Sequence, residues 1–432
     1  MFWDKELETI DRRSLELLQL DRINAALERI SRSDFYRTYY EAKHYKVKPL
    51  KSLEELQGIP FMSKEDLRQS YPMGFVVCEE KDVIRLHSSS GTTGTPTVIC
   101  HTRNDIENWG SLVARCLCMV GADNSDVFQN MMSYGLFSGG LGLHYGAEKI
   151  GMMVIPVGSG NTDRQLKFME DFQSTVVHIT PSYALYLAEI IASRGIRDKL
   201  ALRIGLMGAE PYSESTRKKL EESLLMGVYN SYGLSEMNGP GVAFECSEKE
   251  GMHLWEDNFF LEVIDPATGK VLPDGEEGEI VMSAFNREAM PIFRYRTRDL
   301  AFVYTDKCEC GRTHRRISRI KGRTDDMLII GGVNIFPSQI EHILMKMPEV
   351  GSNYNIVLWT KNNLDKMTVK IEVNPDLFFS DLKHLALLKE QITHKLRNEI
   401  LINPVVELVE PGSLPPSEGK AKRIIDQRSK EK

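Results

Sequence analysis

The sequence lacks the features of exported and membrane proteins. No run of about 18 consecutive apolar residues, the least that spans a bilayer, occurs in its 432 residues. Asp4, Glu6, Glu8 and Asp11 stand where a secretory leader needs basic residues and then an apolar segment. Seven cysteines, an odd number in a long chain, do not make a disulfide framework. We therefore expect a cytoplasmic protein with no membrane partner.

An excess of basic charge is also missing. Lys and Arg number 54 against 61 Asp and Glu, so the formal net charge is −7. Nucleic-acid binding usually depends on a basic surface, so nucleic acid is not expected as a partner. The P-loop pattern G-x-x-x-x-G-K-[ST] is absent as well, which argues against an ordinary P-loop ATPase.

The apolar residues that are present predict an α/β protein. Residues 1–75 are expected to be mostly helical, because apolar residues between Leu20 and Ile30 recur at alternating spacings of three and four. Short β-branched runs then alternate with helix-like stretches, which favours layered α/β subdomains; these runs lie at 152–157, 176–180 and 201–209. Residues 263–285 predict a β-rich segment of hairpins with turns at 266–269 and 273–278.

A polar segment, GRTDD at 322–326, separates two apolar strands and predicts a domain boundary. We expect a large N-terminal domain over 1–322, a hinge at 323–326 and a small, mobile α+β domain over 327–432. The pattern of the small domain is strand, helix from Pro337, two strands, a long helix near 380–398 and a last strand, VVELV.

A loop rich in hydroxyl groups and glycine follows the apolar residues at 83–86. Glycine lets successive backbone N–H groups turn toward one anion, and hydroxyl groups add neutral donors. The loop therefore predicts a site for a nucleotide polyphosphate, with a Ser/Thr-rich surface loop as the alternative. Its predicted phosphate-binding residues are Ser88, Ser89, Ser90, Gly91, Thr92, Thr93 and Gly94.

This loop, SSSGTTGTPT, resembles the signature loop of the adenylate-forming superfamily of acyl-CoA synthetases. Six further blocks, in the same order, look closest to phenylacetate-CoA ligases: YGLFSGGLGLHYGAEKIG, GAEP, NSYGLSE, RYRTRDLA, GRTDDMLIIGGVNIFPSQIE and LPPSEGKAKRIID. The resemblance implies a ligase that uses MgATP to convert a carboxylic acid into an acyl-adenylate, then transfers the acyl group to the thiol of coenzyme A. Two alternatives come from other classes: a phosphotransferase, which would release ADP, and a non-catalytic binding module stabilised by zinc.

The resemblance also assigns residues to the nucleotide. Tyr232 would offer its ring face to adenine, Glu236 would hold Mg²⁺, and Asp299 would accept hydrogen bonds from the ribose, with an ion pair to Arg296 or Arg298 as the alternative for Asp299. Further nucleotide contacts are expected from Gly208, Ala209, Glu210, Pro211, Ser231, Gly233 and Arg323.

The C-terminal blocks carry the other implied roles. Lys420 would be catalytic, bridging the substrate carboxylate and the α-phosphate; Lys422 is its neighbour and competitor. Asp325 would be the hinge residue around which the small domain turns. Gly331 and Gly332 would let the pantetheine arm of coenzyme A approach the backbone, although a strand-end turn explains two glycines equally well.

The phosphate loop departs from the family pattern. Thr95 and Thr97 stand where relatives commonly carry lysine, so the phosphate charge must be neutralised from elsewhere. Lys64 is a candidate, with a solvated surface lysine as the alternative.

Four residues form a candidate metal site. Three thiolates and one imidazole match a closed tetrahedral zinc site, and some relatives carry the same C…H…C-x-C pattern, which favours structural Zn²⁺ over unrelated free thiols. The four ligands would be Cys246, His253, Cys308 and Cys310. Cys78, Cys100, Cys116 and Cys118 are expected to be small core residues.

The acyl pocket is expected around Tyr134 and Phe137, with Gly208 and Ala209 at its floor. Aromatic walls favour an aryl acid such as phenylacetate. The adaptable Met131 and Met132 nearby keep a substituted aryl acetate or an indole acid open as substrates. Transfer to a carrier-protein thiol and a homodimeric assembly also stay open.

Overall fold

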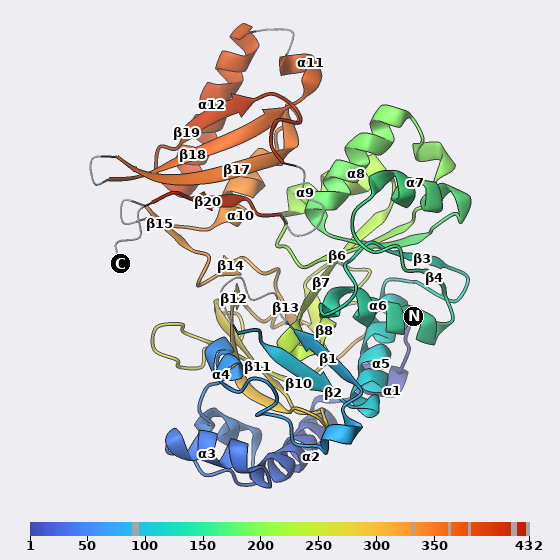
Figure 1. Ribbon diagram of the computed structural model, residues 1–432, viewed down its shortest axis with the longest axis vertical. Helices are drawn as coiled ribbons and strands as arrows, with labels where there is room; N and C mark the ends of the chain where they lie inside the picture. The colour runs from blue at the N-terminus through green and yellow to red at the C-terminus, as the bar shows by residue number, and fades with distance from the viewer. Residues whose placement is uncertain (89–94, 331–332, 362–363, 379–381, 416–420, 429–432) are drawn as a thin grey trace.

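The computed structural model describes residues 1–88, 95–330, 333–361, 364–378, 382–415 and 421–428. Figure 1 shows a large lower part and a smaller upper part, which is formed by the orange and red elements at the C-terminal end of the chain. The mixed α/β architecture and the small C-terminal part confirm the predicted fold class.

Helices cover the N-terminal end, as predicted. Side-chain caps begin all four of them: Asp4, Asp11, Ser33 and Ser63 each accept a hydrogen bond from a backbone N–H in the first turn. The longest helix buries Ile23, Leu27 and Ile30 on one face. The helices are α1 (Lys5–Glu8), α2 (Arg12–Ser31), α3 (Asp34–Ala42) and α4 (Lys64–Gln69), with 3₁₀ turns at Leu53–Gly58 and Glu80–Asp82.

An eight-stranded sheet forms the middle of the molecule. Its order is β13-β9-β8-β7-β6-β5-β3-β4, with parallel pairing from β4 to β7 and antiparallel pairing beyond. The strands are β3 (Val127–Asn130), β4 (Met153–Ile155), β5 (Val176–Ile179), β6 (Ile204–Gly208), β7 (Gly227–Leu234), β8 (Gly239–Glu245), β9 (Met252–Leu254) and β13 (Arg316–Ile317). Helix α5 (Arg103–Met119) precedes β3, and the helices between the strands are α6 (Ser138–Ile150), α7 (Thr162–Asp171), α8 (Pro181–Arg194) and α9 (Glu214–Leu224). The three predicted strand runs are therefore confirmed as β4, β5 and β6.

A second, antiparallel sheet lies below it and has the order β10-β11-β12-β14. Its strands are β10 (Phe259–Ile264), β11 (Gly278–Ala284), β12 (Ile292–Ala301) and β14 (Gly322–Arg323), and a separate two-stranded ribbon joins β1 (Arg85–Ser88) to β2 (Val98–His101). The β10–β11 pair and the bridge between Ile264 and Val271 confirm the predicted hairpins.

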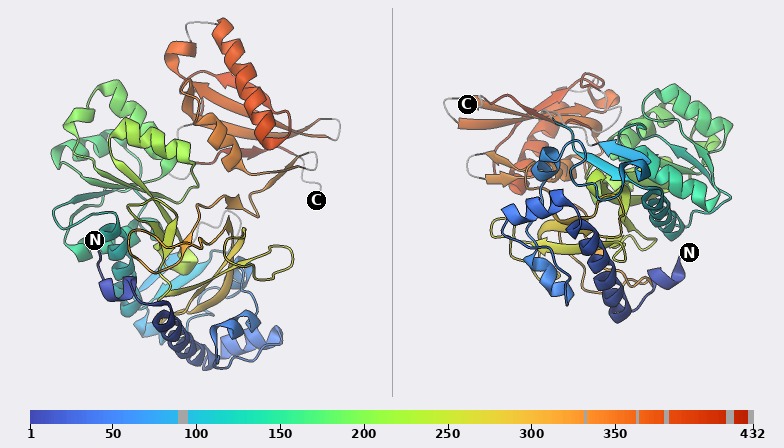
Figure 2. Two further views of the ribbon diagram at one scale, coloured as in Figure 1. Left: turned by 180° about the vertical axis from the view of Figure 1, so that it is seen from behind. Right: turned by 60° about the horizontal axis from the view of Figure 1, so that its bottom comes forward.

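The C-terminal part has its own sheet, of order β19-β18-β17-β20, and Figure 2 shows α12 lying across one face of it. Its elements are β15 (Leu328–Ile330), β16 (Val333–Ile335), α10 (Pro337–Leu344), β17 (Val350–Lys361), β18 (Leu364–Val373), α11 (Pro375–Phe378), α12 (Leu382–Ile400), β19 (Val405–Val409) and β20 (Ile424–Asp426). The sequence pattern predicted VVELV as the last strand, and β20 corrects this: Ile424 and Ile425 pair in parallel with Ile356 and Val357. An apolar pair is enough to extend a sheet that already exists.

None of the described helices is both long and apolar enough to cross a bilayer. Apolar packing is continuous from the region of α8 and α9 into the C-terminal part, because one buried cluster contains Leu187 and Leu220 together with Ile340 and Ile356. The two parts therefore share apolar as well as polar contacts.

Two buried histidines predict a loss of stability in weak acid. Burial, together with the nearby Arg287, lowers the pKa of His101 well below its ordinary value, and burial lowers that of His178 to about 3. Both rings stay neutral in the folded chain but become protonated in the unfolded chain as the pH falls below about 6.5. Each histidine should therefore lower the free energy of unfolding by about 1.4 kcal/mol for every pH unit below about pH 6.5. Above this pH neither histidine should change the free energy of unfolding.

The measurement is urea denaturation across this range. His101 stacks on Trp109 and its ring nitrogens have no hydrogen-bond partner among the described residues, so His101→Phe keeps the shape and should reduce the pH slope. The exposed His384, changed to Gln, is the matched control. Equal slopes for wild type and His101→Phe would contradict the assignment.

Candidate functional site

The site is built where adjacent strands of the large sheet end. Strands β6 and β7 run in parallel with Gly208 opposite Ser231, so the GAEP block leaves the sheet beside NSYGLSE. A Cβ at Gly208 would lie 2.5 Å from the carbonyl oxygen of Ser231, which explains the glycine. Ala209 follows with φ +67°, a left-handed conformation uncommon for alanine. This geometry turns the chain sharply at the sheet edge.

A buried carboxylate connects two blocks of the site. The hydroxyl of Tyr232 donates to Asp299 Oδ2 at 2.7 Å, and Arg323 donates to Oδ1 at 3.0 Å. The predicted alternative for Asp299 is wrong: Arg296 and Arg298 pair instead with Glu279, at 2.5 Å and 3.7 Å. Strand geometry explains this, because Arg323 on β14 pairs in register with Asp299 on β12.

Asp299 is only 7% exposed. Its pKa is raised above the ordinary value, because burial outweighs the opposing effects of Arg323 and the Tyr232 hydroxyl, which stabilise the ionised form. An ionised carboxylate has about four acceptor positions, and two of them hold Tyr232 and Arg323 here. Asp299 can therefore accept further donors such as hydroxyl groups.

A second buried carboxylate, Glu236, lies in the turn after β7 and is 5% exposed. Tyr295 donates to Glu236 Oε1 at 3.2 Å, and Arg287 donates to its backbone carbonyl at 2.9 Å. Neither Tyr295 nor Arg287 was predicted as a site residue; Tyr295 belongs to the RYRTRDLA block, and Arg287 lies in no predicted block. Lys64 Nζ lies 3.9 Å from Glu236 Oε1. Lys64 is therefore next to a buried carboxylate rather than isolated on the surface.

The predicted phosphate loop begins beside the YGLF block. Ser88 ends β1, and its N–H donates to the carbonyl of Leu136 at 2.9 Å. Ser138, at the start of α6, is 2.9 Å from Ser235 through their hydroxyl oxygens. The other predicted loop residues, Ser89, Ser90, Gly91, Thr92, Thr93 and Gly94, lie outside the described residues.

The predicted aromatic walls differ in their surroundings. Tyr134 is half-buried; Asn130 Nδ2 donates to its hydroxyl at 2.9 Å, and His144 Nδ1 lies 3.2 Å from the same oxygen. Phe137 is 45% exposed, just before α6. Burial raises the pKa of the Tyr134 hydroxyl to about 12. The tyrosine is therefore neutral and held in place, whereas Phe137 has a free face.

Glu210 reaches toward the C-terminal part. Its carboxylate accepts from the backbone N–H of Ser182 at 3.2 Å, from the Ser182 hydroxyl at 3.0 Å and from the backbone N–H of Ala421. Ala421 follows the predicted catalytic residue Lys420, which lies outside the described residues, as do Gly331 and Gly332. The GAEP block and the LPPSEGKAKRIID block are thus neighbours in space.

The predicted hinge begins at Arg323, the last residue of β14, and ends two residues before β15. Arg323 forms a fork with Asp325, with Nε 2.8 Å from Oδ1 and a terminal nitrogen 3.0 Å from Oδ2. The same guanidinium donates to Asp299, so the Arg323 side chain links the predicted hinge to the RYRTRDLA block.

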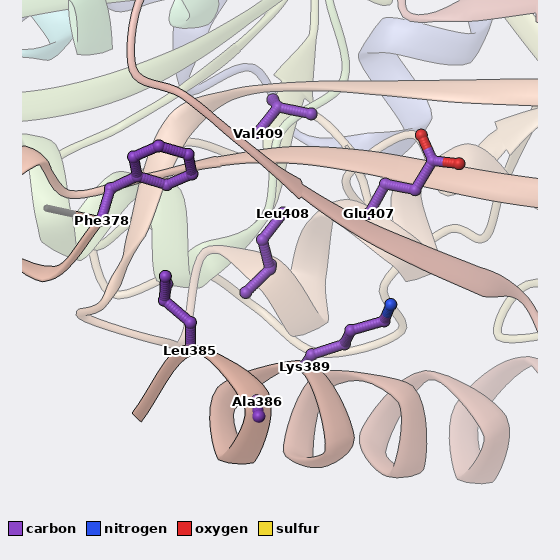
Figure 3. Close-up of a pocket in the computed structure, with 7 residues that line it drawn as sticks. All are labelled: Phe378, Leu385, Ala386, Lys389, Glu407, Leu408 and Val409. Carbon is purple, nitrogen blue, oxygen red and sulfur yellow. The ribbon is translucent and has the colours of Figure 1, made fainter. Parts of the chain in front are cut away.

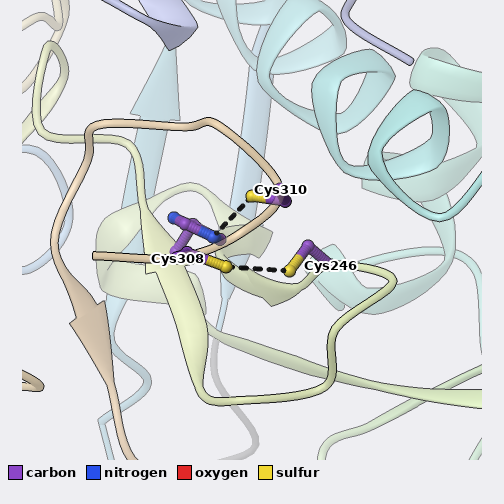
Figure 4. A group of neighbouring side chains, drawn as sticks. Cys246, Cys308 and Cys310 are labelled. Carbon is purple, nitrogen blue, oxygen red and sulfur yellow. Dashed lines mark hydrogen bonds between the residues drawn. The ribbon is translucent and has the colours of Figure 1, made fainter. Parts of the chain in front are cut away.

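The four candidate metal ligands come together (Figure 4). Their ligand atoms all lie within 4.8 Å of one another, with Cys246 Sγ 3.6 Å from Cys308 Sγ and Cys310 Sγ 3.3 Å from His253 Nε2. His253 Nδ1 lies 3.1 Å from the carbonyl oxygen of His314, which leaves Nε2 for a metal. The donor set fits tetrahedral zinc. Cys100, Cys116 and Cys118 are buried elsewhere, and Cys78 is half-buried.

A cavity of about 390 Å³ lies elsewhere, between α12 and β19 (Figure 3). It is lined by Phe378, Leu385, Ala386, Lys389, Glu407, Leu408 and Val409, none of which is a predicted site residue. This cavity belongs to the C-terminal part alone.

The fold and the gathered strand-end blocks define an adenylate-forming enzyme with a separate C-terminal domain. The sequence profile of the AMP-binding enzyme family matches residues 18–286, and the profile of the AMP-binding enzyme C-terminal domain matches 332–428. The phenylacetate-coenzyme A ligase of Thermus thermophilus is 43% identical over 99% of this chain and 100% of the relative, and that of Escherichia coli is 39% identical over 98% and 97%. The chain belongs to the AMP-binding enzyme family, and within it to the phenylacetate-CoA ligases.

A solved 2-hydroxyisobutyryl-CoA ligase has the same fold. In its postadenylation state with 2-HIB-AMP, it matches with a TM-score of 0.92 and 27% identity over 98% of this chain and 91% of that chain. In its thioesterification state with 2-HIB-AMP and CoA, the TM-score is 0.72 at the same identity, over 98% and 92%. The structure described here therefore resembles the postadenylation state more closely.

Proposed function

We propose that this protein is an AMP-forming ligase that joins an aryl carboxylic acid, phenylacetate first, to coenzyme A. The observation that carries the proposal is the clustering of Tyr232, Glu236, Asp299 and Arg323, contributed by three separate blocks, in a chain that matches phenylacetate-coenzyme A ligases over nearly its whole length.

The reaction begins with a carboxylate, which a thiol cannot attack productively because the leaving group would be oxide. A carboxylate oxygen instead attacks the α-phosphorus of ATP, the bond to the β-phosphate breaks, and pyrophosphate leaves. The protein contributes positioning and neutralisation of the converging negative charges.

Several residues support this first step. Tyr232 would present its ring to adenine, and its hydroxyl donates a hydrogen bond to Asp299. Asp299 would also accept hydrogen bonds from the ribose hydroxyl groups. Glu236 would hold Mg²⁺, a hard cation that prefers oxygen ligands and neutralises phosphate charge when bound. Lys64, beside Glu236, supplies the cation that the phosphate loop lacks at Thr95 and Thr97. The proposed acyl pocket has Tyr134 and Phe137 as aromatic walls above Gly208 and Ala209.

In the second step, the thiol sulfur of coenzyme A attacks the acyl carbon and AMP leaves with the bonding electrons, while the thiol proton passes to solvent. We assign a hinge at 323–326, centred on Asp325, between domains 1–322 and 327–432, so that the small domain serves both steps. Gly331 and Gly332 are proposed to border the pantetheine arm.

The four-residue cluster of Cys246, His253, Cys308 and Cys310 is proposed to hold a structural zinc ion. Three cysteines and one histidine complete a tetrahedral site, so no coordination position remains for catalysis. A reducing cytoplasm would keep these thiols available as metal ligands.

Product analysis tests the proposed function. Purified protein is incubated with ATP, Mg²⁺, coenzyme A and phenylacetate, and with indole-3-acetate and hydroxylated aryl acetates as competing acids. The expected products are AMP, pyrophosphate and the aryl-CoA thioester, formed only when free coenzyme A is present. Release of ADP would indicate a phosphotransferase, and adenylate formation without transfer to free coenzyme A would indicate loading of a carrier protein.

A further inference from the structure

The C-terminal domain is joined to the body by a buried carboxylate. Glu341, on α10, is 8% exposed and accepts from the Ser213 N–H at 3.3 Å, from the Ser213 hydroxyl at 3.4 Å and from the Thr216 hydroxyl. Ser213 caps α9 and Thr216 lies in its first turn. The carboxylate of one domain is therefore held at the positive end of a helix of the other domain.

The hydrogen-bond donors to Glu341, Ser213 and Thr216, are neutral. Burial raises the pKa of Glu341, while these hydrogen bonds and the charge of Arg423, a residue of its own domain, oppose the shift. When the domains separate, the carboxylate and the two hydroxyl groups all regain water. A contact of this kind is strong enough to favour one orientation and can still be broken in each cycle.

Other hydrogen bonds cross the same boundary. Glu189 on α8 accepts from the N–H of Ser352 at 3.2 Å, and Lys219 donates to the carbonyl of Val350 at 3.4 Å. Glu210 accepts from the N–H of Ala421. These bonds connect body side chains to backbone groups of the C-terminal domain, so they form and break together with the domain orientation.

The comparison with one ligase in two states identifies that orientation. The higher TM-score belongs to the postadenylation state and the lower one to the thioesterification state, although the sequence identity is the same. The contacts of Glu341 thus belong to the orientation that resembles the postadenylation state, in which that ligase holds its acyl-adenylate; below we call it the adenylation orientation.

We propose that Glu341, through Ser213 and Thr216, is a positioning residue that holds the C-terminal domain in the adenylation orientation. This rests on the proposed function. Glu341 touches no substrate in this role; it sets how often the domain that carries Lys420 occupies the arrangement needed for the first step.

The test measures the two half-reactions separately. Glu341→Ala is expected to lower pyrophosphate release in the absence of coenzyme A by about tenfold, because the adenylation orientation is less populated. Thioester formation from preformed phenylacetyl-adenylate and coenzyme A should stay at the wild-type rate or rise. Thr216→Val should give the same pattern, the double variant should add little, and Glu341→Gln, which keeps an acceptor oxygen, should be milder. The exposed Glu390, changed to Gln, is the control.

Hydrogen–deuterium exchange gives a readout independent of activity. In Glu341→Ala, exchange should increase at Ser213 and also at the Ser352 N–H, which bonds to Glu189 and not to Glu341. Equal losses in both half-reactions, or faster exchange confined to Ser213 and Thr216, would overturn the proposal. If wild-type protein releases no pyrophosphate, the proposed function fails, and the exchange at Ser352 still decides whether Glu341 holds the domains together.

Discussion

Lys420→Ala should lose adenylation and keep thioester formation. The ammonium group is proposed to bridge the substrate carboxylate and the α-phosphate as their negative charges converge, and loss of one such contact lowers a rate by about 100- to 1000-fold. Preformed phenylacetyl-adenylate no longer needs this bridge, so its conversion with coenzyme A should continue. Pyrophosphate release and thioester formation, measured in separate assays, give the two rates.

Lys422→Ala is the matched control, because Lys422 is exposed and lies two residues further along the chain. It is expected to leave both half-reactions close to wild type. Loss of both half-reactions to the same extent in Lys420→Ala would contradict a mechanism in which the domain turns between two arrangements. Loss of adenylation in Lys422→Ala instead would move the catalytic assignment by two residues.

The second large effect concerns the cysteine and histidine cluster. Protein purified without added metal should contain about one equivalent of zinc per chain. Cys310→Ser should lose this zinc, and its unfolding free energy should fall by about 4 kcal/mol, as expected for a metal present at a thousandfold excess over its dissociation constant. Elemental analysis and urea denaturation measure the two quantities.

Cys78→Ser is the control for this change, because Cys78 is half-buried and lies outside the cluster. It should keep the zinc and most of the stability. Cys308 and Cys310 lie on the chain between Asp299 and Arg323. Metal removal should therefore also weaken the nucleotide site indirectly, whereas wild-type protein without zinc but with full stability would remove the metal assignment.

Patterns that act within a short segment were predictable from the sequence. The helical periodicity before residue 75 and the β-branched runs of β4, β5 and β6 depend on local burial, so they appear as predicted. The cluster of Cys246, His253, Cys308 and Cys310 could be suggested because thiolate and imidazole have specific chemistry, but its two halves are 54 residues apart and only the fold brings them within 4.8 Å.

Contacts set by strand register were not predictable in the same way. The pairing of Asp299 with Arg323 rather than with Arg296 or Arg298 depends on β12 and β14 being neighbours. Tyr295 reaches Glu236 from β12, and Arg287 reaches it from the connection between β11 and β12; no local pattern indicates this. The strand β20 was missed because three residues carry too little periodicity to distinguish an edge strand from a tail.

The edge strand β20 also governs how the end of this chain can be handled. Its pairing with β17 begins at Ile424, four residues after Lys420, so an anchored segment follows the lysine closely along the chain. Trimming the chain before Ile424, or fusing a bulky partner close behind Asp426, would release that anchor and leave the lysine attached from one side only.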